Sequence, residues 1–360
     1  MTKKLKFLFL LKKNSTGYDD NYNPFFTNNL KIKSGLSNSA HFIADAVSKY
    51  FNIETKVEVC IDGNSIDKEL HLFKPDVCFI EAIWITVEKM NEIAKLYPEV
   101  LFVVRVHSKT TFLANEGVAI GWLKGYEKIK NVFVSFNNEK TNDEFKSIGF
   151  QPIYLPNIYE VKSKYMSCYE KLKNFFNNYK KKKIIDIGCF GAIRPMKNQL
   201  LQAVASIRYA EKYNKKIRFH VNGSRTEQKG ENVLKNLRAL FNETEHELIE
   251  QPWLNHEDFL TLITKMDIGL QVSLSESFNI VTADFISQHV PVIVSKEINW
   301  VADIAKVNTD DSAGIAEKIH LTLSSPNKLL KKNLEALKEY EREALTIWFL
   351  FVKDFTEGNI

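Results

Sequence analysis

The chain has 360 residues, of which 44% are hydrophobic and 26% are charged, and its formal net charge is +5. This length is enough for two hydrophobic cores. The modest positive charge favours an anionic ligand but falls short of the dense basic stripe of a dedicated nucleic-acid binder. No run approaches the roughly 20 apolar residues of a membrane span. The short apolar run after Lys6 is interpreted as a strand and not as a signal peptide.

The four cysteines show no CxxC motif or other paired spacing, and they are Cys60, Cys78, Cys168 and Cys189. Three of them neighbour apolar, strand-like runs. This usage is typical of reduced thiols and not of a zinc site, and it predicts a cytoplasmic protein.

Short apolar runs alternate with helical patterns in the first half of the chain, and this alternation predicts a parallel sheet covered by helices on both faces. The polar run from Asn14 to Asn38 is long enough to be a functional loop. We expect this first domain to span residues 1–158. Its predicted strands are Lys6–Leu11, Val57–Ile61, Val77–Ile80, Val100–Val106, Val132–Ser135 and Pro152–Leu155, and its helices include Ser39–Phe51 and Thr86–Leu96.

A Lys-, Tyr- and Asn-rich stretch at 159–183 is predicted to be a solvated hinge. The alternation then restarts, which predicts a second α/β domain at 184–335, with ligands outside the carboxyl ends of its strands. The stretch Asn327–Phe355 has a helical pattern with a potential break near Glu341, and its apolar end predicts burial. The predicted strands of this half are Ile184–Gly188, Ile217–Val221, His246–Gln251, Ile268–Val272 and Val292–Val294.

The strongest functional motif follows the predicted strand Ile268–Val272 and opens a helix that runs to about His289. A helix N-terminus offers unpaired backbone N–H groups and a positive dipole end, which suits phosphate. Glu276 in the loop can accept hydroxyl groups of a sugar, and Asp284 on the helix can bind a ribose diol. The competing interpretation makes Glu276 an exposed loop acid and Asp284 a charge on the helix surface.

A second motif follows the predicted strand Ile184–Gly188 and precedes a predicted helix at Gln199–Glu211. It contains Gly191 and two cations, Arg194 and Lys197. At the end of a strand, the arginine can make a forked contact with a diphosphate, and the lysine supplies a point charge. A single basic loop residue is usually only solvated, but both together with the carboxylate motif predict a phosphate site.

Two loops of the first half are weaker candidates. The segment Ser34–Ser39 opens a helix, with Gly35 available for close backbone approach and Ser37 or Ser39 as the N-cap. His107 lies just past a predicted strand, although a lone histidine is more often structural.

Together these residues resemble the GT-B glycosyltransferases, specifically the retaining enzymes of family 4. The resemblance spans nearly the whole chain. It is carried by the Gly191 loop with Lys197, by the strand Phe219–Gly223, and by the spacing Glu276-x7-Asp284 followed by His289-Val290-Pro291-Val292-Ile293.

The resemblance implies two Rossmann-like domains that face each other across a cleft, with a closing helix at 336–360 that packs back on the first domain. It implies that Glu276 contacts the donor sugar, Asp284 the ribose, and Arg194 and Lys197 the diphosphate. It places His107 near the transferred sugar. The other residues that it assigns to donor binding are Gly35, Gly191, Gly223, Trp253, Leu254, Ser277, Phe278, Asn279 and Ile280.

Three positions depart from the family pattern and leave the identity of the donor open. Asp284 stands where the family has a glutamate, Ala192 stands where an arginine usually follows the glycine, and Asn198 stands where a glycine is usual.

Cleavage of a glycosyl–diphosphate bond builds negative charge on the leaving phosphate, which preorganised cations and helix-end amides can stabilise. We therefore expect Arg194, Lys197 and the amides of Ser277–Ile280 to act without a metal or other cofactor, with a UDP-sugar as substrate. The resemblance implies retention of the anomeric configuration, by front-face attack.

The acceptor is left open among a saccharide, a lipid-linked glycan, a protein and a modified DNA base. Three alternative functions also stand. The chain could be a nucleotide-sugar epimerase or phosphorylase of the same fold, a transferase acting on modified DNA bases, or a non-catalytic protein that binds sugar nucleotides or nucleic acid.

Overall fold

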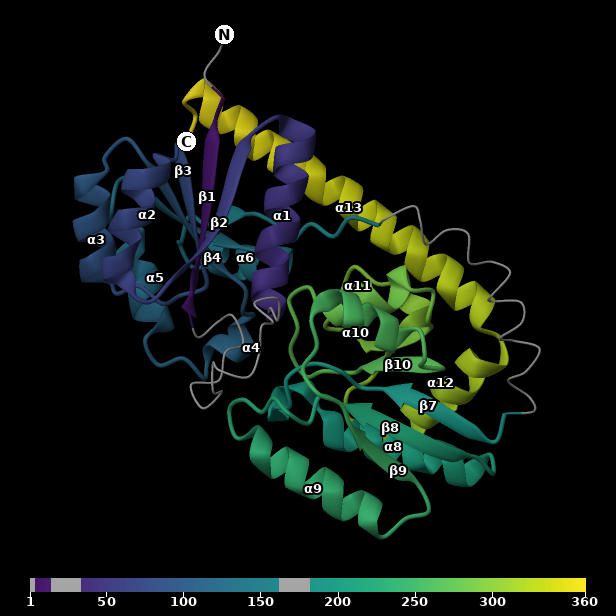
Figure 1. Cartoon of the computed structure of the whole chain (residues 1–360). Helices are drawn as coiled ribbons and strands as arrows, with labels where there is room; N and C mark the ends of the chain where they lie inside the picture. The colour runs from purple at the N-terminus through teal and green to yellow at the C-terminus, as the bar shows by residue number, and fades with distance from the viewer. Residues whose placement is uncertain (1–3, 14–33, 162–181) are drawn as a thin grey trace. The chain divides into compact units, whose positions relative to one another are not determined.

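The computed structural model describes residues 4–13, 34–161 and 182–360. Most of the predicted loop from Asn14 to Asn38, most of the predicted hinge at 159–183, and Cys168 lie outside the described residues. The chain divides into two compact units (Figure 1). The first consists of Met1–Glu160 and Glu341–Ile360, and the second of Val161–Tyr340.

The first unit contains a parallel sheet of six strands in the order β2-β1-β3-β4-β5-β6. The order reverses between β1 and β3, as in a doubly wound sheet. The strands are β1 (Lys6–Lys12), β2 (Glu54–Cys60), β3 (Val77–Glu81), β4 (Leu101–Val106), β5 (Val132–Phe136) and β6 (Ile153–Tyr154). The α-helices between them are α1 (Gly35–Phe51), α2 (Ile66–Phe73), α3 (Val87–Leu96), α4 (Thr110–Leu113), α5 (Ala119–Tyr126) and α6 (Glu139–Ser147).

The second unit repeats the architecture with a parallel sheet in the order β12-β11-β10-β7-β8-β9. Its strands are β7 (Ile184–Gly188), β8 (Lys216–Val221), β9 (Glu247–Glu250), β10 (Ile268–Gln271), β11 (Val292–Ser295) and β12 (Lys306–Val307). Its α-helices are α8 (Gln199–Lys212), α9 (Gly230–Asn242), α10 (His256–Ile263), α11 (Ile280–Ser287) and α12 (Ser312–Ser324). The prediction of two Rossmann-like α/β domains is confirmed.

The central strands of the first unit are buried on both faces, so their apolar side chains fill two separate layers. Leu8 and Ile80 point into a core that α2, α3 and α5 cover. Phe9 and Phe79 point to the other face, where they stack with ring centroids 4.7 Å apart. This alternation places Phe7, Phe9 and Phe79 together on the second face, and we call this cluster the aromatic layer.

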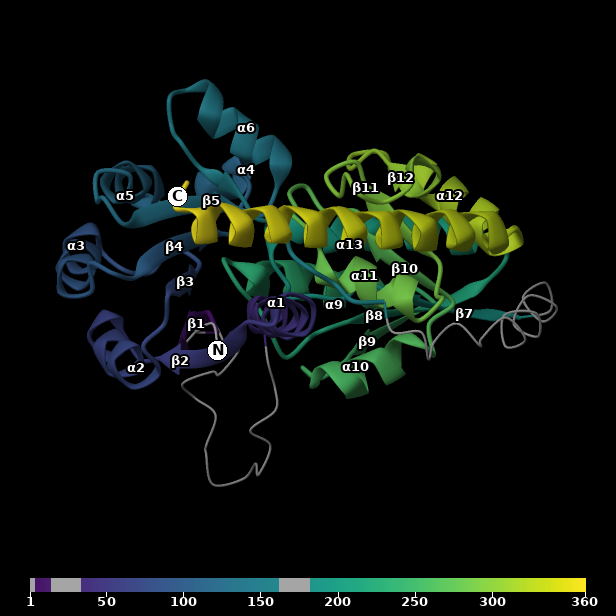
Figure 2. The ribbon, with the colours of Figure 1, turned by 90° about the horizontal axis from the view of Figure 1, so that it is seen from above.

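Helix α13 (Pro326–Glu357) is unbroken, so the potential break near Glu341 was wrong (Figures 1 and 2). Its last part belongs to the first unit, as the resemblance implied. There Trp348 is fully buried, its ring centroid lies 5.4 Å from that of Phe79, and its Nε1 donates to the carbonyl of Pro156 at 2.8 Å. The end of the chain therefore completes the aromatic layer of the first unit.

Two local predictions were also wrong. Helix α1 begins at Gly35, and its N-cap is Ser34, whose Oγ accepts from the backbone N–H of Ser37 at 3.2 Å. Neither Ser37 nor Ser39 is the cap, because Ser34 is the residue that keeps the extended backbone of a cap. Strand β12 was missed because its residues, Lys306 and Val307, are only half-buried and do not form an apolar run. None of the helices in the described ranges is long and apolar enough to cross a membrane.

Replacement of Trp348 by alanine should destabilise the first unit by about 3–5 kcal/mol, because it leaves a cavity in the aromatic layer and an unpaired carbonyl at Pro156. Phe349 is the matched control, since it is the next residue of the same helix and is 53% exposed. Phe349→Ala should cost less than about 1 kcal/mol. Hydrogen exchange in β1 and β3 under mild denaturant measures the difference, and equal losses of protection in the two variants would contradict this packing.

Candidate functional site

Strands β7 and β10 are parallel neighbours in the sheet of the second unit. The strands that follow β7 in sequence lie on one side of this pair, and those that follow β10 lie on the other side, so the strand order reverses here. At such a switch point the loops after the two strands separate and leave room for a ligand. The loop after β7 contains Gly191, and the loop after β10 contains Glu276. Both predicted motifs therefore lie at the position where this topology binds ligands.

The loop after β7 is shaped by two residues with positive φ. Gly191 has φ +114°, and its N–H donates to Oδ1 of Asn222 at 2.8 Å. Asn198 has φ +58°, and its Nδ2 donates to the carbonyls of Val272 and Thr309. Asparagine tolerates this left-handed conformation better than most residues with a side chain.

The two loops meet through an ion pair between Lys197 and Glu276, whose Nζ and Oε1 are 2.5 Å apart. The lysine side chain is 12% exposed and the carboxylate 8%. The second cation, Arg194, lies 3.4 Å from a carboxylate oxygen of Glu227. Burial acts to raise the pKa of Glu276, but the charges of Lys197 and Arg194 outweigh it and lower that pKa.

The loop after β10 turns into α11 through Asn279, which has φ +61° and caps the helix by accepting the N–H of Thr282 at 2.9 Å. Phe278 is buried and stacks against Trp300 and Tyr340, with centroids 5.3 and 5.0 Å away. The segment Ser277–Ile280 is thus held rigidly at the start of the helix.

Asp284 is 1% exposed and forms an ion pair with His256, whose Nε2 lies 2.7 Å from the carboxylate. His256 is the first residue of α10, two positions after Leu254. This pair brings the loop that contains Trp253 and Leu254 next to α11. The guanidinium of Arg225 lies 4.3 Å from the ring centroid of Trp253 and provides a flat cationic surface there.

The interpretation of Glu276 and Asp284 as surface charges is wrong, since both are buried and paired. Packing alone explains why a glycine stands at position 223, because an added Cβ would lie 2.5 Å from Oε2 of Glu250 on β9. His256 was missed from the sequence, and its only signal was its place at the start of a helix capped by Asn255.

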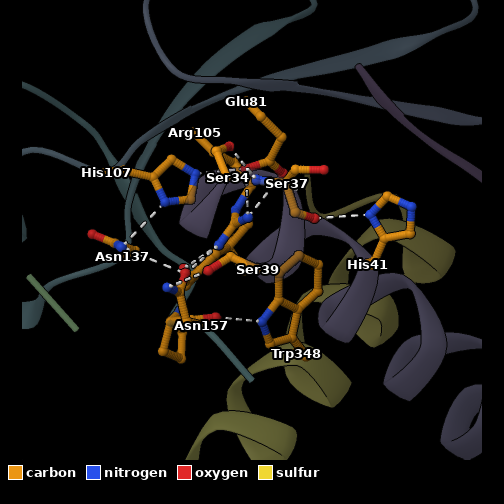
Figure 3. A network of polar contacts seen from close by, with 12 residues as sticks. Ser34, Ser37, Ser39, His41, Glu81, Arg105, His107, Asn137, Asn157 and Trp348 are labelled. Atoms are coloured by element: carbon orange, nitrogen blue, oxygen red, sulfur yellow. Dashed lines mark hydrogen bonds and ion pairs between the residues drawn. The ribbon is translucent and has the colours of Figure 1, made fainter. Parts of the chain in front are cut away.

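A second polar cluster lies at the carboxyl ends of β3 and β4 in the first unit. We call it the His107 network and define it as Glu81, Arg105, His107, Asn137 and Asn157 (Figure 3). The imidazole Nε2 of His107 lies 2.5 Å from Oε2 of Glu81, and the guanidinium of Arg105 binds both oxygens of that carboxylate. The sequence pointed to His107 alone. Gly35 is the first residue of α1, outside this network.

The pKa values of this network are shifted in opposing ways by burial and charge. Burial acts to raise the pKa of Glu81, but the charge of Arg105 and the hydrogen bond to His107 lower it overall. Burial lowers the pKa of His107, although the Glu81 carboxylate opposes this shift. The lowered pKa favours the neutral form of His107.

No group of three or more histidine, cysteine or acidic side chains that could hold a metal ion occurs within residues 4–13, 34–161 and 182–360. The three cysteines in these ranges, Cys60, Cys78 and Cys189, are free and buried. Burial raises the pKa of Cys60 to about 11, which makes its thiol unreactive.

Residues 170–344 match the family model of the glycosyl transferases group 1. None of the curated protein sequences matches the chain. Solved structures with a similar fold include the N-terminal domain of Candida albicans trehalose-6-phosphate phosphatase, with a TM-score of 0.65 and 14% identity over 99% of this chain and 97% of that one. Anabaena HepE in complex with UDP and glucose has a TM-score of 0.62 and 14% identity, over 98% of this chain and 100% of that one.

An Escherichia coli trehalose-6-phosphate structure bound with UDP-2-fluoro glucose also matches, with a TM-score of 0.62 and 12% identity, over 97% of this chain and 98% of that one. These likenesses extend over nearly the whole chain and show that it has the two-domain GT-B fold.

Replacement of Glu276 by glutamine should lower the unfolding free energy of the second unit by about 3 kcal/mol at neutral pH, because Lys197 loses its counter-charge. The pKa of Glu276 is lowered in the folded state. The pair's contribution is therefore present above the ordinary pKa of a glutamate and is lost as pH falls through the lowered value. Denaturant unfolding as a function of pH measures both effects.

Glu245→Gln is the control, because Glu245 is an exposed acid of the same unit. It should leave both the stability and its acid dependence nearly unchanged. If Glu276→Gln behaved like this control, the ion pair would have no role in stability.

Proposed function

We propose that this chain, whose residues 170–344 match the glycosyl transferases group 1, transfers a sugar from a nucleoside-diphosphate sugar to an acceptor. The observation that carries this proposal is the buried Lys197–Glu276 pair at the switch point of the second sheet. A cation for phosphate and a carboxylate for sugar hydroxyls stand there side by side, as the two halves of such a donor require.

The donor is proposed to be a UDP-sugar. Two structures of the same fold hold such groups, since Anabaena HepE was solved with UDP and glucose and the E. coli structure with UDP-2-fluoro glucose. In this chain, Trp253 and Leu254 would contact the base. The Asp284 carboxylate is already bound by His256, so the ribose would meet this histidine–aspartate pair and not a free acid.

In the proposed donor complex, the diphosphate replaces Glu276 as the partner of Lys197, and Glu276 turns to the hydroxyls of the sugar. Arg194 and the start of α11 at Ser277–Ile280 add further positive potential. The shape of the Gly191 loop supports this arrangement, because an added Cβ at Gly191 would lie 3.5 Å from Cε of Lys197. A side chain at this position would narrow the space beside the lysine.

The proposed reaction retains the anomeric configuration by attack on the face that the diphosphate leaves. The bond between the anomeric carbon and the diphosphate oxygen breaks, and its electron pair stays on the phosphate. The acceptor hydroxyl oxygen forms the new bond to the same carbon, and its proton passes to the departing phosphate oxygen. The sugar is oxocarbenium-like in between, and the cations stabilise the leaving group.

Calorimetry with a panel of nucleoside diphosphates and their sugars tests the proposal, followed by an assay of the hit with saccharide, lipid-linked, protein and DNA acceptors. Transfer to an acceptor supports a glycosyltransferase. Conversion of the donor without any acceptor would favour an epimerase, and tight binding without conversion would favour a binding protein.

Lys197→Ala should reduce kcat/KM by about 30- to 1,000-fold, because the leaving diphosphate loses a preorganised cation. Lys212→Ala is the matched control, since Lys212 ends the helix that follows the same loop and its side chain is 61% exposed. Steady-state kinetics with the identified donor measure both. An unchanged kcat/KM in a correctly folded Lys197→Ala protein would remove this residue from the mechanism.

Transfer should persist in excess EDTA, because Lys197 and Arg194 supply the positive charge that a divalent ion would otherwise bring to the diphosphate. The measurement is the initial rate before and after chelation. Loss of activity that Mg²⁺ or Mn²⁺ restores would overturn the proposal of a metal-independent enzyme.

A further inference from the structure

Arg105 is a fully buried cation on β4, and it stands directly opposite Glu81 of β3 in the sheet register. Both side chains lie on the face of the sheet that also carries Phe79. A guanidinium group can only donate hydrogen bonds, so every atom that it contacts must be an acceptor. This one-way character determines the orientation of the polar groups around it.

Two paths of hydrogen bonds, which we call arms, connect the guanidinium of Arg105 to His107. The first arm passes through Glu81. Nη1 of Arg105 donates to both carboxylate oxygens, at 2.9 and 3.0 Å. An ionised carboxylate can only accept, and Oε2 also lies 2.5 Å from Nε2 of His107. Nε2 must therefore carry a hydrogen.

The other arm leads to His107 through two amides. Nη2 of Arg105 donates to Oδ1 of Asn157 at 3.3 Å, and this orients the amide so that its Nδ2 donates to Oγ of Ser39 at 3.2 Å. The atom of Asn137 that lies 3.4 Å from the same Oδ1 must then be its nitrogen. This nitrogen is 3.3 Å from Nδ1 of His107, which therefore accepts.

The two arms agree and close a ring of hydrogen bonds that begins and ends on Arg105 (Figure 3). They select one state of His107, the neutral tautomer with hydrogen on Nε2. The opposite tautomer would place an N–H against the amide N–H of Asn137 and a lone pair against the carboxylate of Glu81.

The charges of the network favour the same neutral state. Its charged groups are Glu81 from β3 and Arg105 from β4, and they neutralise each other. In the described part of the chain, the residues that the printed contacts join to these two are uncharged, namely Asn137 after β5, Asn157 after β6, Ser39 of α1 and Trp348 of α13. An imidazolium would add a second positive charge beside Arg105.

Helix α13 fixes the second arm. The ring of Trp348 lies 5.4 Å from the guanidinium carbon of Arg105, and its Nε1 donates to the carbonyl of Pro156. The segment Leu155–Asn157 is thereby held between the indole and the guanidinium, because Nη2 of Arg105 also donates to the carbonyl of Leu155.

We propose that Glu81, Arg105, Asn137 and Asn157 are positioning residues that hold His107 as the neutral Nε2–H tautomer, and that His107 takes no proton during the transfer. The proposal rests on the proposed function, in which the proton of the acceptor passes to the leaving phosphate. It gives His107 the role of an uncharged hydrogen-bonding group in the proposed reaction.

Nitrogen NMR of the full chain with labelled histidine tests the tautomer without any substrate. The signals of His107 are those that are missing in His107→Gln. At neutral pH they should show a protonated Nε2 and an unprotonated Nδ1. A protonated Nδ1, alone or together with Nε2, would overturn the proposal.

Asn137→Asp tests the network directly, because a carboxylate at Nδ1 would stabilise a second proton on the ring. The pKa of His107 should rise, the imidazolium should be present at neutral pH, and kcat should fall by about tenfold or more. Activity should recover as pH rises through the new pKa. Asn115→Asp, at an exposed position of the same unit, should leave both the ring and kcat as in the wild type.

These results separate the two proposals. If the ring of Asn137→Asp stays neutral in the folded protein, Asn137 does not control Nδ1 and the positioning role fails. If wild-type protein shows the Nε2–H tautomer but binds no nucleotide-sugar, the proposed function fails while the assignment of the ring state stands.

Discussion

A carboxylate buried at the carboxyl edge of a parallel sheet is stable in its ionised form only beside a cation, and each unit of this chain contains such a pair. Glu81 is neutralised by Arg105, and Glu276 by Lys197. The two pairs differ in how easily another anion could replace the carboxylate as the partner of the cation. The first is fully buried and joins Nη1 of the arginine to both carboxylate oxygens, whereas the second joins single atoms of side chains that are about one-tenth exposed. The first pair can therefore serve as fixed scaffold, and the second can change partners.

Both ion pairs lie at the carboxyl edge of their sheets, but this difference implies that they would have different functions. A diphosphate can compete for a lysine ammonium, because its three donors rotate freely and adapt to a new acceptor. In the proposed function, the ion pair of Lys197 and Glu276 would hold both side chains in place until the donor binds. The guanidinium of Arg105 is occupied by a carboxylate, a carbonyl and an amide, so it has a structural task in setting the state of His107.

The sequence was most informative where burial leaves a regular pattern. Strands covered on both faces gave apolar runs within a few residues of their true bounds. The loops after β7 and β10, where the sequence predicted the site of the second unit, follow neighbouring strands of its sheet. The pairing of Glu81 with Arg105 was missed because it depends on the register of two strands, although an arginine within the apolar run Leu101–Val106 was a signal. The bond between His256 and Asp284 is likewise tertiary. The cap of α1 was misplaced because Ser34, Ser37 and Ser39 all have the side chain of a good cap.

Because the last part of helix α13 belongs to the first unit, the two units cannot complete folding in the order in which they are synthesised. The strands of the first unit emerge early, but Trp348 and Phe351, which cover Phe79, are made only after the whole second unit. The second unit is continuous in sequence from Val161 to Tyr340 and can fold as soon as it leaves the exit tunnel. The N-terminal half of the protein is therefore the later one to reach its native state, and until then its aromatic layer is a natural target for chaperones.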